Sequence, residues 1–224
     1  MKETDKASQL ANNPWDEIYS STEKYTFYDI NAAHEFIPNV IDFFTQNGVR
    51  NVLDIGCGIG RNSLPLAENG LSVSAIDSSE RAVKRLKEAS VSLKLDISAS
   101  VADFRQLPYE NGSFDAVLSI QVINHGFQKD VQMAISEVAR VLKPGGVFFI
   151  TVPGRMANGQ VRYCLVKTAT KVEPNTFIPT QGNEVGQPHF IFNRSLILSL
   201  FDRFQIIKIE KDANDYYCIW GRKK

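Results

Sequence analysis

The chain has 224 residues, of which 43% are hydrophobic and 22% charged, a composition typical of a folded domain and not of a disordered chain. Its 25 basic and 25 acidic residues give a formal net charge of zero, so the basic excess of a dedicated nucleic-acid binder is absent. The sequence has no apolar run of about 20 residues and no signal peptide, which predicts no membrane span and favours the cytoplasm.

The predicted elements begin after a polar tail, residues 1–13, and a segment rich in aromatic residues, 14–31. Apolar residues then recur at helical spacing from Phe36 to Phe44, and Asn47-Gly48 ends that helix. The next hundred residues alternate strands with helices. The predicted strands are 51–55, 71–76, 98–102, 114–120 and 147–152; the predicted helices are 62–68, a helix capped by Ser78 or Ser79 and running past Ala89, and 131–142.

After Pro153 the periodicity fades. Residues 154–188 are rich in glycine and proline near their end, and their length indicates a lid or substrate-facing insertion. A helix over 196–201 and two closing strands, 204–209 and 216–220, complete the chain. Alternating strands and helices predict an α/β fold: a Rossmann-like, doubly wound, mostly parallel seven-stranded sheet with an antiparallel last strand. In such sheets a ligand lies at the carboxyl ends of the strands.

The clearest chemical signal is the run Val52-Leu-Asp-Ile-Gly-Cys-Gly-Ile-Gly60, a strand that enters a glycine-rich turn before a helix. Glycines allow positive φ and a close approach of the backbone to a ligand. A dinucleotide site would have the spacing G-x-G-x-x-G, but here Arg61 replaces the third glycine. Asp77 ends the second strand, where a carboxylate can accept two ribose hydroxyls, and this feature is shared by dinucleotide and adenosyl ligands.

Four motifs in order resemble the class I S-adenosylmethionine-dependent methyltransferases of small-molecule type, over about half of the chain. They are LDIGCGIGRNS, AID, ADFRQLPYENGSFDAVLS and EVARVLKPGGVFFITVPG. The resemblance implies S-adenosylmethionine as cofactor. The implied cofactor-binding residues are Asp54, Gly56, Cys57, Gly58, Gly60 and Asn62 for the methionine part and its loop, Asp77 for the ribose, Ser78, Asp103 and Phe104 for the adenine, and Gln121 beside the sulfonium. A shorter match, Gly60-Arg-Asn-Ser-Leu64, is similar to the tellurite-resistance methyltransferases.

With this resemblance the chain divides into four parts. Residues 1–48 form an N-terminal tail with a lid and helix, 49–153 the S-adenosylmethionine-binding core, 154–190 the substrate-facing insertion, and 191–224 a helix and closing strands of the same domain.

Methyl transfer needs alignment of the acceptor and, for a hard nucleophile, a general base. His125, just after the fourth strand, is the predicted catalytic base, with an ordinary loop histidine as the alternative. His189 and His34 are weaker candidates. We predict that Tyr19, Tyr25 and Tyr28, together with His189, face the substrate, although packing of the aromatic segment is the alternative.

The predicted function is methyl transfer to an O, N or S atom of a small molecule. Two alternatives stay open: a binding module without turnover and an NAD-dependent oxidoreductase. The region 120–125 lacks the N/D-P-P-Y motif of enzymes that methylate amino groups of nucleic acids, so a nucleic-acid partner is not expected. The three cysteines have no CxxC spacing, which argues against a disulfide framework and a zinc site, and we predict no metal. The sequence does not predict the oligomeric state.

Overall fold

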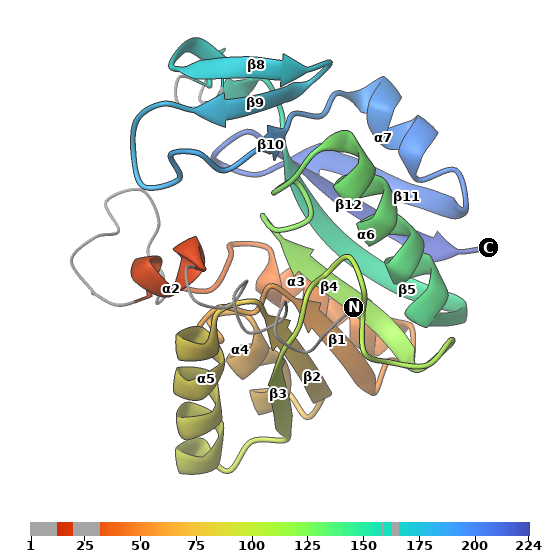
Figure 1. The fold of residues 1–224 in the computed structure, drawn as a ribbon. Helices are drawn as coiled ribbons and strands as arrows, with labels where there is room; N and C mark the ends of the chain where they lie inside the picture. Colours follow the sequence, from red (N-terminus) through yellow and green to blue (C-terminus); the bar gives the residue numbers. More distant parts are fainter. Residues whose placement is uncertain (1–12, 20–31, 158, 163–165) are drawn as a thin grey trace, which may run out of the picture.

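A seven-stranded sheet runs through the computed structural model, which describes residues 13–19, 32–157, 159–162 and 166–224 (Figure 1). Its strand order is β11-β12-β5-β4-β1-β2-β3. The strands are β1 (Asn51–Ile55), β2 (Ser72–Asp77), β3 (Ile97–Val101), β4 (Phe114–Ile120), β5 (Leu142–Pro153), β11 (Phe204–Lys211) and β12 (Tyr216–Lys223). β1 to β5 pair in parallel, and β12 is antiparallel to both β5 and β11. The predicted fold class is confirmed.

Helices cover both faces of the sheet because neighbouring residues of each strand point to opposite sides. In β1, Val52 packs in the cluster with α3, α4 and α5, whereas Leu53 packs in the cluster with α6 and α7. The helices are α2 (Pro14–Ile18), α3 (Ile37–Gln46), α4 (Ser63–Glu68), α5 (Glu80–Leu93), α6 (Gln128–Val141) and α7 (Arg194–Leu200). In the described part of the chain, no helix is both long and apolar enough to cross a membrane.

Capping residues explain where two helices begin. Ser79, not Ser78, caps α5: its Oγ accepts the N–H of Ala82 at 3.1 Å. Asn193 caps α7 by accepting the N–H of Leu196, so α7 begins two residues before the predicted 196. α6 begins three residues before the predicted 131 and β12 ends three residues after the predicted 220; the other predicted bounds are within two residues of the observed ones, except at β5.

β5 begins five residues earlier than predicted. The segment Lys143-Pro-Gly-Gly146 was expected to break the chain between helix and strand, yet α6 passes directly into β5 at Leu142. The fully buried Leu142 pairs with Phe114 of β4, and the register shifts before the Ala116–Val147 pair. The Pro-Gly-Gly bend is therefore an irregularity inside the strand and not a loop before it.

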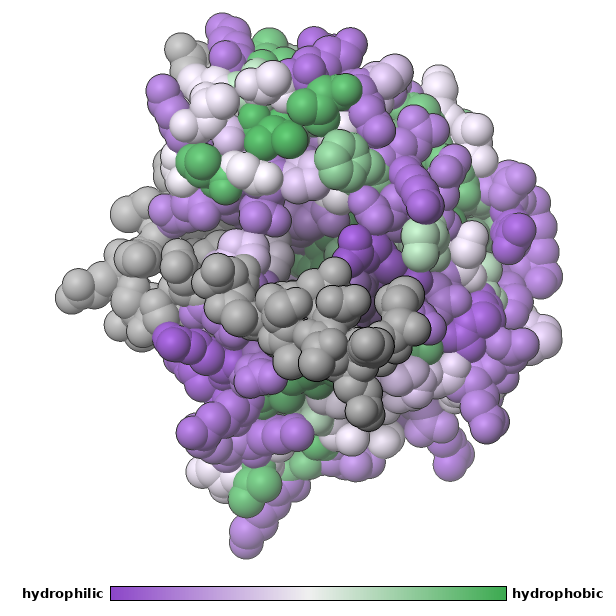
Figure 2. All heavy atoms as spheres, in the orientation of Figure 1, coloured by the Kyte–Doolittle hydropathy of each residue, from purple (hydrophilic) through white to green (hydrophobic). Residues whose placement is uncertain are grey.

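The insertion has more structure than the sequence predicted. Five short strands lie between residues 154 and 190: β6 (Met156–Ala157), β7 (Gln160–Val161), β8 (Ala169–Glu173), β9 (Thr176–Pro179) and β10 (His189–Phe190). β10, β9 and β8 form a small antiparallel sheet at the top of Figure 1. In Figure 2 the described surface is mainly hydrophilic, with hydrophobic side chains gathered near the β8–β9 hairpin. Strands of two to five residues carry too few side chains to produce a detectable period.

Two isoleucines of the same sheet provide a matched test of the core. Ile150 in β5 is fully buried in the α6–α7 cluster, whereas Ile207 in β11 is 50% exposed. Ile150→Ala should lower the free energy of unfolding by about 2–5 kcal/mol, through lost burial and the cavity left behind. Ile207→Ala should cost less than about 1 kcal/mol. Urea unfolding of both variants measures the difference, and equal losses would contradict the assignment of the core.

Candidate functional site

A cavity of about 890 Å³ lies at the carboxyl ends of β1, β2 and β4, where the fold class predicts a ligand. Its wall comes from the loops after these strands, from β3, from α2, and from the end of the insertion. The lining includes most of the residues predicted from the sequence: Gly56, Cys57, Gly58, Asn62, Asp77, Ser78, Asp103, Phe104, Gln121, His125, His189 and Tyr19. Tyr25 and Tyr28 lie outside the described residues.

Asp77 fixes the glycine turn to the end of β2. Its Oδ2 accepts the N–H of Gly58 at 2.9 Å, and its Oδ1 accepts the N–H of Ser79 at 2.9 Å. Burial raises the pKa of Asp77, and the two backbone N–H groups partly oppose this. Gly58 has φ +54°, and a Cβ there would lie 2.7 Å from the Tyr19 hydroxyl oxygen. The turn therefore depends on glycine for its conformation and for the approach of Tyr19.

Asp54 and Gly60, both predicted to bind the cofactor, lie behind the cavity wall and not on it. The buried carboxylate of Asp54 accepts the Ser63 hydroxyl at 2.5 Å. Burial raises the pKa of Asp54 to about 7; the Ser63 hydrogen bond opposes the shift and the charge of Asp77 adds to it. At Gly60 a Cβ would lie 2.3 Å from Leu86 of α5. Gly60 therefore allows α5 to pack closely against the turn.

Asp103 lines the cavity beyond β3, and Arg105 holds its carboxylate. The guanidinium Nε lies 3.0 Å from both carboxylate oxygens, and Nη2 donates to Oδ2. Burial alone would raise the pKa of Asp103, but the hydrogen bonds from Arg105 outweigh it and lower that pKa below its ordinary value. The backbone N–H of Arg105 also donates to Oδ1 at 2.8 Å, so Arg105 engages both carboxylate oxygens and fixes their orientation at the cavity wall.

Gln121 occupies a strained backbone position at the end of β4. Its φ is +61°, which is unusual for a residue other than glycine. The backbone N–H of Gln121 donates to Thr151 of β5, at 2.9 Å to the hydroxyl and 3.3 Å to the carbonyl oxygen. These two contacts hold the strained turn in place at the cavity. Strain that neighbouring contacts maintain in this way is common at functional sites.

The N-terminal segment covers one side of the cavity. Asn13 donates its side-chain amide to the Ser78 carbonyl oxygen, and Asp16 accepts the Ser79 hydroxyl. α2 therefore lies beside the start of α5, as Figure 1 shows. Trp15 also lines the cavity, although the sequence had given it only as a member of an aromatic segment. Its ring packs edge-on against His125, with 4.7 Å between the ring centroids.

Two histidines meet where the loop after β4 and the end of the insertion form the cavity wall. The backbone of 124–126 pairs with that of 188–190, so His125 and His189 are directly opposite each other. Their ring centroids are 4.8 Å apart. His189 Nε2 lies 2.9 Å from one carboxylate oxygen of Glu184, and His125 Nε2 lies 3.9 Å from the other. Burial and the neighbouring His189 lower the pKa of His125 to about 4, so its imidazole is neutral at pH 7.

Glu184 and Asn124 are cavity residues that the sequence reasoning missed. Burial would raise the pKa of Glu184, but the two histidines outweigh it and lower that pKa. Glu184 lies in the insertion, five residues before His189, where no periodicity marks it. Asn124 is 2% exposed, and its Oδ1 has no donor in the described part of the chain. Its position one residue before His125 was the available signal.

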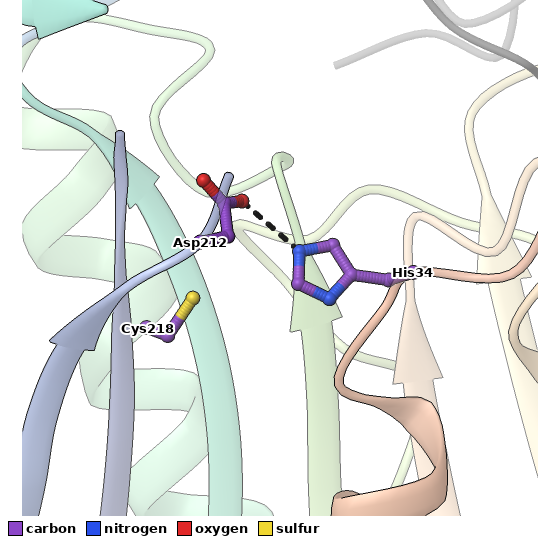
Figure 3. A group of neighbouring side chains, drawn as sticks. All are labelled: His34, Asp212 and Cys218. Atoms are coloured by element: carbon purple, nitrogen blue, oxygen red, sulfur yellow. Dashed lines mark hydrogen bonds and ion pairs between the residues drawn. The ribbon is translucent and has the colours of Figure 1, made fainter. Parts of the chain in front are cut away.

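His34, the other histidine considered from the sequence, does not line the cavity. It precedes α3, and its Nε2 lies 3.1 Å from Asp212 Oδ2, near Cys218 of β12 (Figure 3). The Phe36 N–H donates to His34 Nδ1, and Asp212 Oδ1 accepts two backbone N–H groups. This buried contact ties the start of α3 to the β11–β12 connection and has a structural role.

Comparison with known proteins identifies the domain. A model of the methyltransferase domain matches residues 53–150, from β1 to β5. A ubiquinone biosynthesis O-methyltransferase of Caulobacter vibrioides is 40% identical over 46% of this chain and 41% of its own length. Residues 53–150 thus carry the methyltransferase domain, and the chain is similar to S-adenosylmethionine-dependent methyltransferases. Its cofactor is therefore S-adenosylmethionine, and the nicotinamide alternative is set aside.

Two further relatives of this methyltransferase extend over more of the chain. The tRNA N(3)-methylcytidine methyltransferase trm140 of Schizosaccharomyces pombe is 29% identical over 94% of the chain and 68% of its own length. The structure of the PH0226 protein from Pyrococcus horikoshii OT3 has a TM-score of 0.65 and 26% identity, and the match covers 89% of this chain and 95% of that one. The match thus spans about two fifths of the Caulobacter O-methyltransferase and about two thirds of trm140. By their names, these two enzymes methylate different acceptors.

The raised pKa of Asp54 generates a prediction for the free methyltransferase. The Asp54 carboxyl keeps its proton up to about pH 7 in the folded protein, whereas its ordinary pKa is 3.8. The protonated carboxyl therefore contributes its full share to the free energy of unfolding below pH 3.8, and this share is lost as the pH rises through 7. Relative to Asp54→Asn, the free energy of unfolding of the wild type should fall by up to about 4 kcal/mol between pH 4 and pH 8, because each unit of pKa shift corresponds to about 1.4 kcal/mol.

Chemical unfolding of both proteins across this range measures the difference. The same substitution at the exposed Asp202 is the control and should follow the wild type. Parallel curves for wild type and Asp54→Asn would show that Asp54 is ionised in the folded protein.

Proposed function

We propose that this methyltransferase transfers the methyl group of S-adenosylmethionine to an O, N or S atom of a small molecule bound in the same cavity. The proposed cofactor contacts follow the cavity from the glycine turn to Asp103. In this assignment Gly56, Cys57, Gly58 and Asn62 hold the methionine part with Asp54 and Gly60 behind them, Asp77 accepts the ribose hydroxyls, Ser78, Asp103 and Phe104 meet the adenine, and Gln121 lies beside the sulfonium.

The excess of acidic side chains on the cavity wall is the main support for a small-molecule acceptor. The lining has five carboxylate side chains but only two guanidinium groups and no lysine in the part of the chain that is described: Asp77, Glu80, Asp103, Asp130 and Glu184 against Arg61 and Arg105. Such a wall attracts the cationic cofactor and repels a polyanion such as RNA. The volume of about 890 Å³ also falls in the range of about 300–1,000 Å³ that small-molecule sites occupy.

The acceptor end of the cavity is proposed to be the part near His125. His189 and Glu184 reach it from the insertion, which supports a substrate-facing role for residues 154–190, and Trp15 reaches it from the N-terminal segment. Tyr19 is proposed to face the substrate from beside Gly58. The Oδ1 of Asn124 offers a hydrogen-bond acceptor there for a ligand donor. The N-terminal segment thus acts as a lid over the core, residues 49–153, as the proposed division of the chain requires.

His125 is proposed to take the proton that the acceptor loses. When bound, S-adenosylmethionine supplies a methyl group on a positively charged sulfur. The Nδ1 of His125 lies 3.0 Å from the Val122 carbonyl oxygen, which can only accept a hydrogen bond, so Nδ1 carries the proton and Nε2 has a free lone pair. That lone pair accepts the acceptor proton as the new bond to carbon forms, and His125 becomes the imidazolium. The Trp15 ring, packed against His125, excludes water from this end.

The tRNA relative supports a second candidate function, methylation of a nucleic acid, and a binding module without turnover is a third. Radiolabelled S-adenosylmethionine separates the three when the protein is offered a metabolite extract and, separately, total tRNA. We expect label in the small-molecule fraction and none in tRNA. Label that enters tRNA would contradict the proposed acceptor class, and label that enters neither fraction would contradict turnover.

A pair of glycines tests the proposed cofactor contact. Gly58 and Gly70 both have positive φ, so valine strains the backbone at either position. A side chain at Gly58 enters the cavity against Tyr19, whereas nothing lies within 4 Å of a Cβ at Gly70. Gly58→Val should weaken S-adenosylhomocysteine binding at least about 100-fold by calorimetry, and Gly70→Val should lower stability with unchanged affinity. Equal affinities would exclude the turn as the binding site.

A further inference from the structure

Two groups of three side chains in the described residues could each hold a metal ion, and their hydrogen bonds distinguish them. In the group His34–Asp212–Cys218, His34 Nδ1 accepts the Phe36 N–H, so its proton is on Nε2 and points to Asp212 (Figure 3). Every hydrogen bond of this imidazole is therefore satisfied without an ion. This group needs no ligand and carries no proposal.

The group His125–Glu184–His189 has the opposite proton arrangement. His125 Nδ1 lies 3.0 Å from the Val122 carbonyl oxygen, and His189 Nδ1 lies 2.9 Å from the Gln187 carbonyl oxygen. Because a carbonyl cannot donate, both Nδ1 atoms carry a proton, so Nε2 is the atom of each ring that can ligate a metal ion.

Both Nε2 atoms face the Glu184 carboxylate, at 2.9 Å from His189 and 3.9 Å from His125. The three ligand atoms lie within 4.8 Å of one another. A metal ion would take the place of the proton in the hydrogen bond between His189 Nε2 and Glu184 and would draw in Nε2 of His125 as a further ligand.

We propose that His125 Nε2, His189 Nε2 and the Glu184 carboxylate bind one divalent transition-metal ion of the zinc class at the acceptor end of the cavity. Two imidazoles and one carboxylate are a ligand set used by catalytic zinc sites, which keep a further position open for substrate or water. Histidines that ligate metals usually donate their other N–H to a backbone carbonyl, as both rings do here. Nitrogen ligands disfavour magnesium and calcium, which prefer all-oxygen sites.

The pairing of 124–126 with 188–190 is what assembles the site. Gly126 N–H donates to the Pro188 carbonyl oxygen and Phe190 N–H donates to the Asn124 carbonyl oxygen, both at 2.8 Å. This bridge puts the two histidines on opposite strands at the same level, and His189 is only 1% exposed. The ligands are thus held before any ion arrives, which lowers the ordering cost of binding.

The ion would change how the acceptor loses its proton, an inference that rests on the proposed function. With Nε2 of His125 engaged as a ligand, that atom is no longer a free base. A hydroxyl or thiol of the acceptor in the open position would instead release its proton to water more readily as it binds, because a bound cation stabilises the resulting anion. The preferred acceptors are then molecules with an oxygen or sulfur donor that can coordinate a metal.

Cobalt(II) titration of the untagged, chelator-treated full chain tests the site without need of an acceptor. We expect one equivalent of Co²⁺ to bind with visible d–d absorption and without thiolate charge-transfer absorption, and Zn²⁺ to displace it. Glu184→Gln and His189→Ala should each weaken Co²⁺ binding at least about 100-fold, since even the loss of a group that only orients a ligand costs about 10–100-fold. Cys218→Ser is the control and should bind as the wild type does.

Absence of Co²⁺ binding by the wild type would overturn the proposal. The hydrogen bond between His189 Nε2 and the Glu184 carboxylate would then be what holds these groups together. Thiolate absorption that disappears in Cys218→Ser, or binding that Glu184→Gln does not change, would overturn it as well. S-adenosylhomocysteine affinity, measured on every variant, reports folding and the cofactor site. Intact Co²⁺ binding with no methyl transfer to small molecules would contradict the proposed function alone.

Discussion

The hydrogen bond from the Gly58 N–H to the Asp77 carboxylate is the contact on which the geometry of the cavity depends. It joins the turn after β1 to the end of β2, and the second oxygen of Asp77 holds the N–H of Ser79 at the start of α5. One buried carboxylate thus sets the positions of two loops and a helix. Its exposure is only 8%, so a bound ligand would meet an acceptor that the protein has already oriented and partly desolvated.

The two ends of the cavity use burial in opposite ways. Beside the glycine turn, burial raises the pKa values of Asp54 and Asp77 and makes their charged forms costly. These buried charges make the free protein less stable than it would be with uncharged side chains at both positions, and a bound cationic cofactor would offset that cost. At the other end, burial lowers the pKa of His125 and keeps the imidazole neutral, with a lone pair available. Burial thus acts on acids beside the glycine turn and on an imidazole beside the insertion, with opposite effects on charge.

Sequence reasoning predicted the alternating strands and helices of the core and most of the cavity wall because these features have local signals. The glycine turn, Asp77 and Asp103 follow apolar strands, and parallel strands bring their carboxyl ends to one edge. Glu184 had no such signal: its approach to His125 depends on backbone pairing between segments about 60 residues apart, in an insertion of very short strands. The long β5 was missed for a related reason, since Pro-Gly-Gly normally ends a regular element and is here tolerated as a bend.

The position of β12 has a consequence for how the sheet is completed. β11 meets the rest of the sheet only through β12, which pairs with β5 on its other side. The β-hairpin that they form has its ends tied down by distant parts of the chain: His34 contacts Asp212, and Arg222 donates to the Gly145 carbonyl oxygen. These contacts join residues far apart in sequence, so they form only after long loops have closed. β11 is paired only with β12 and belongs to the seven-stranded sheet only through the pairing of β12 with β5, so loss of that pairing would detach both strands together.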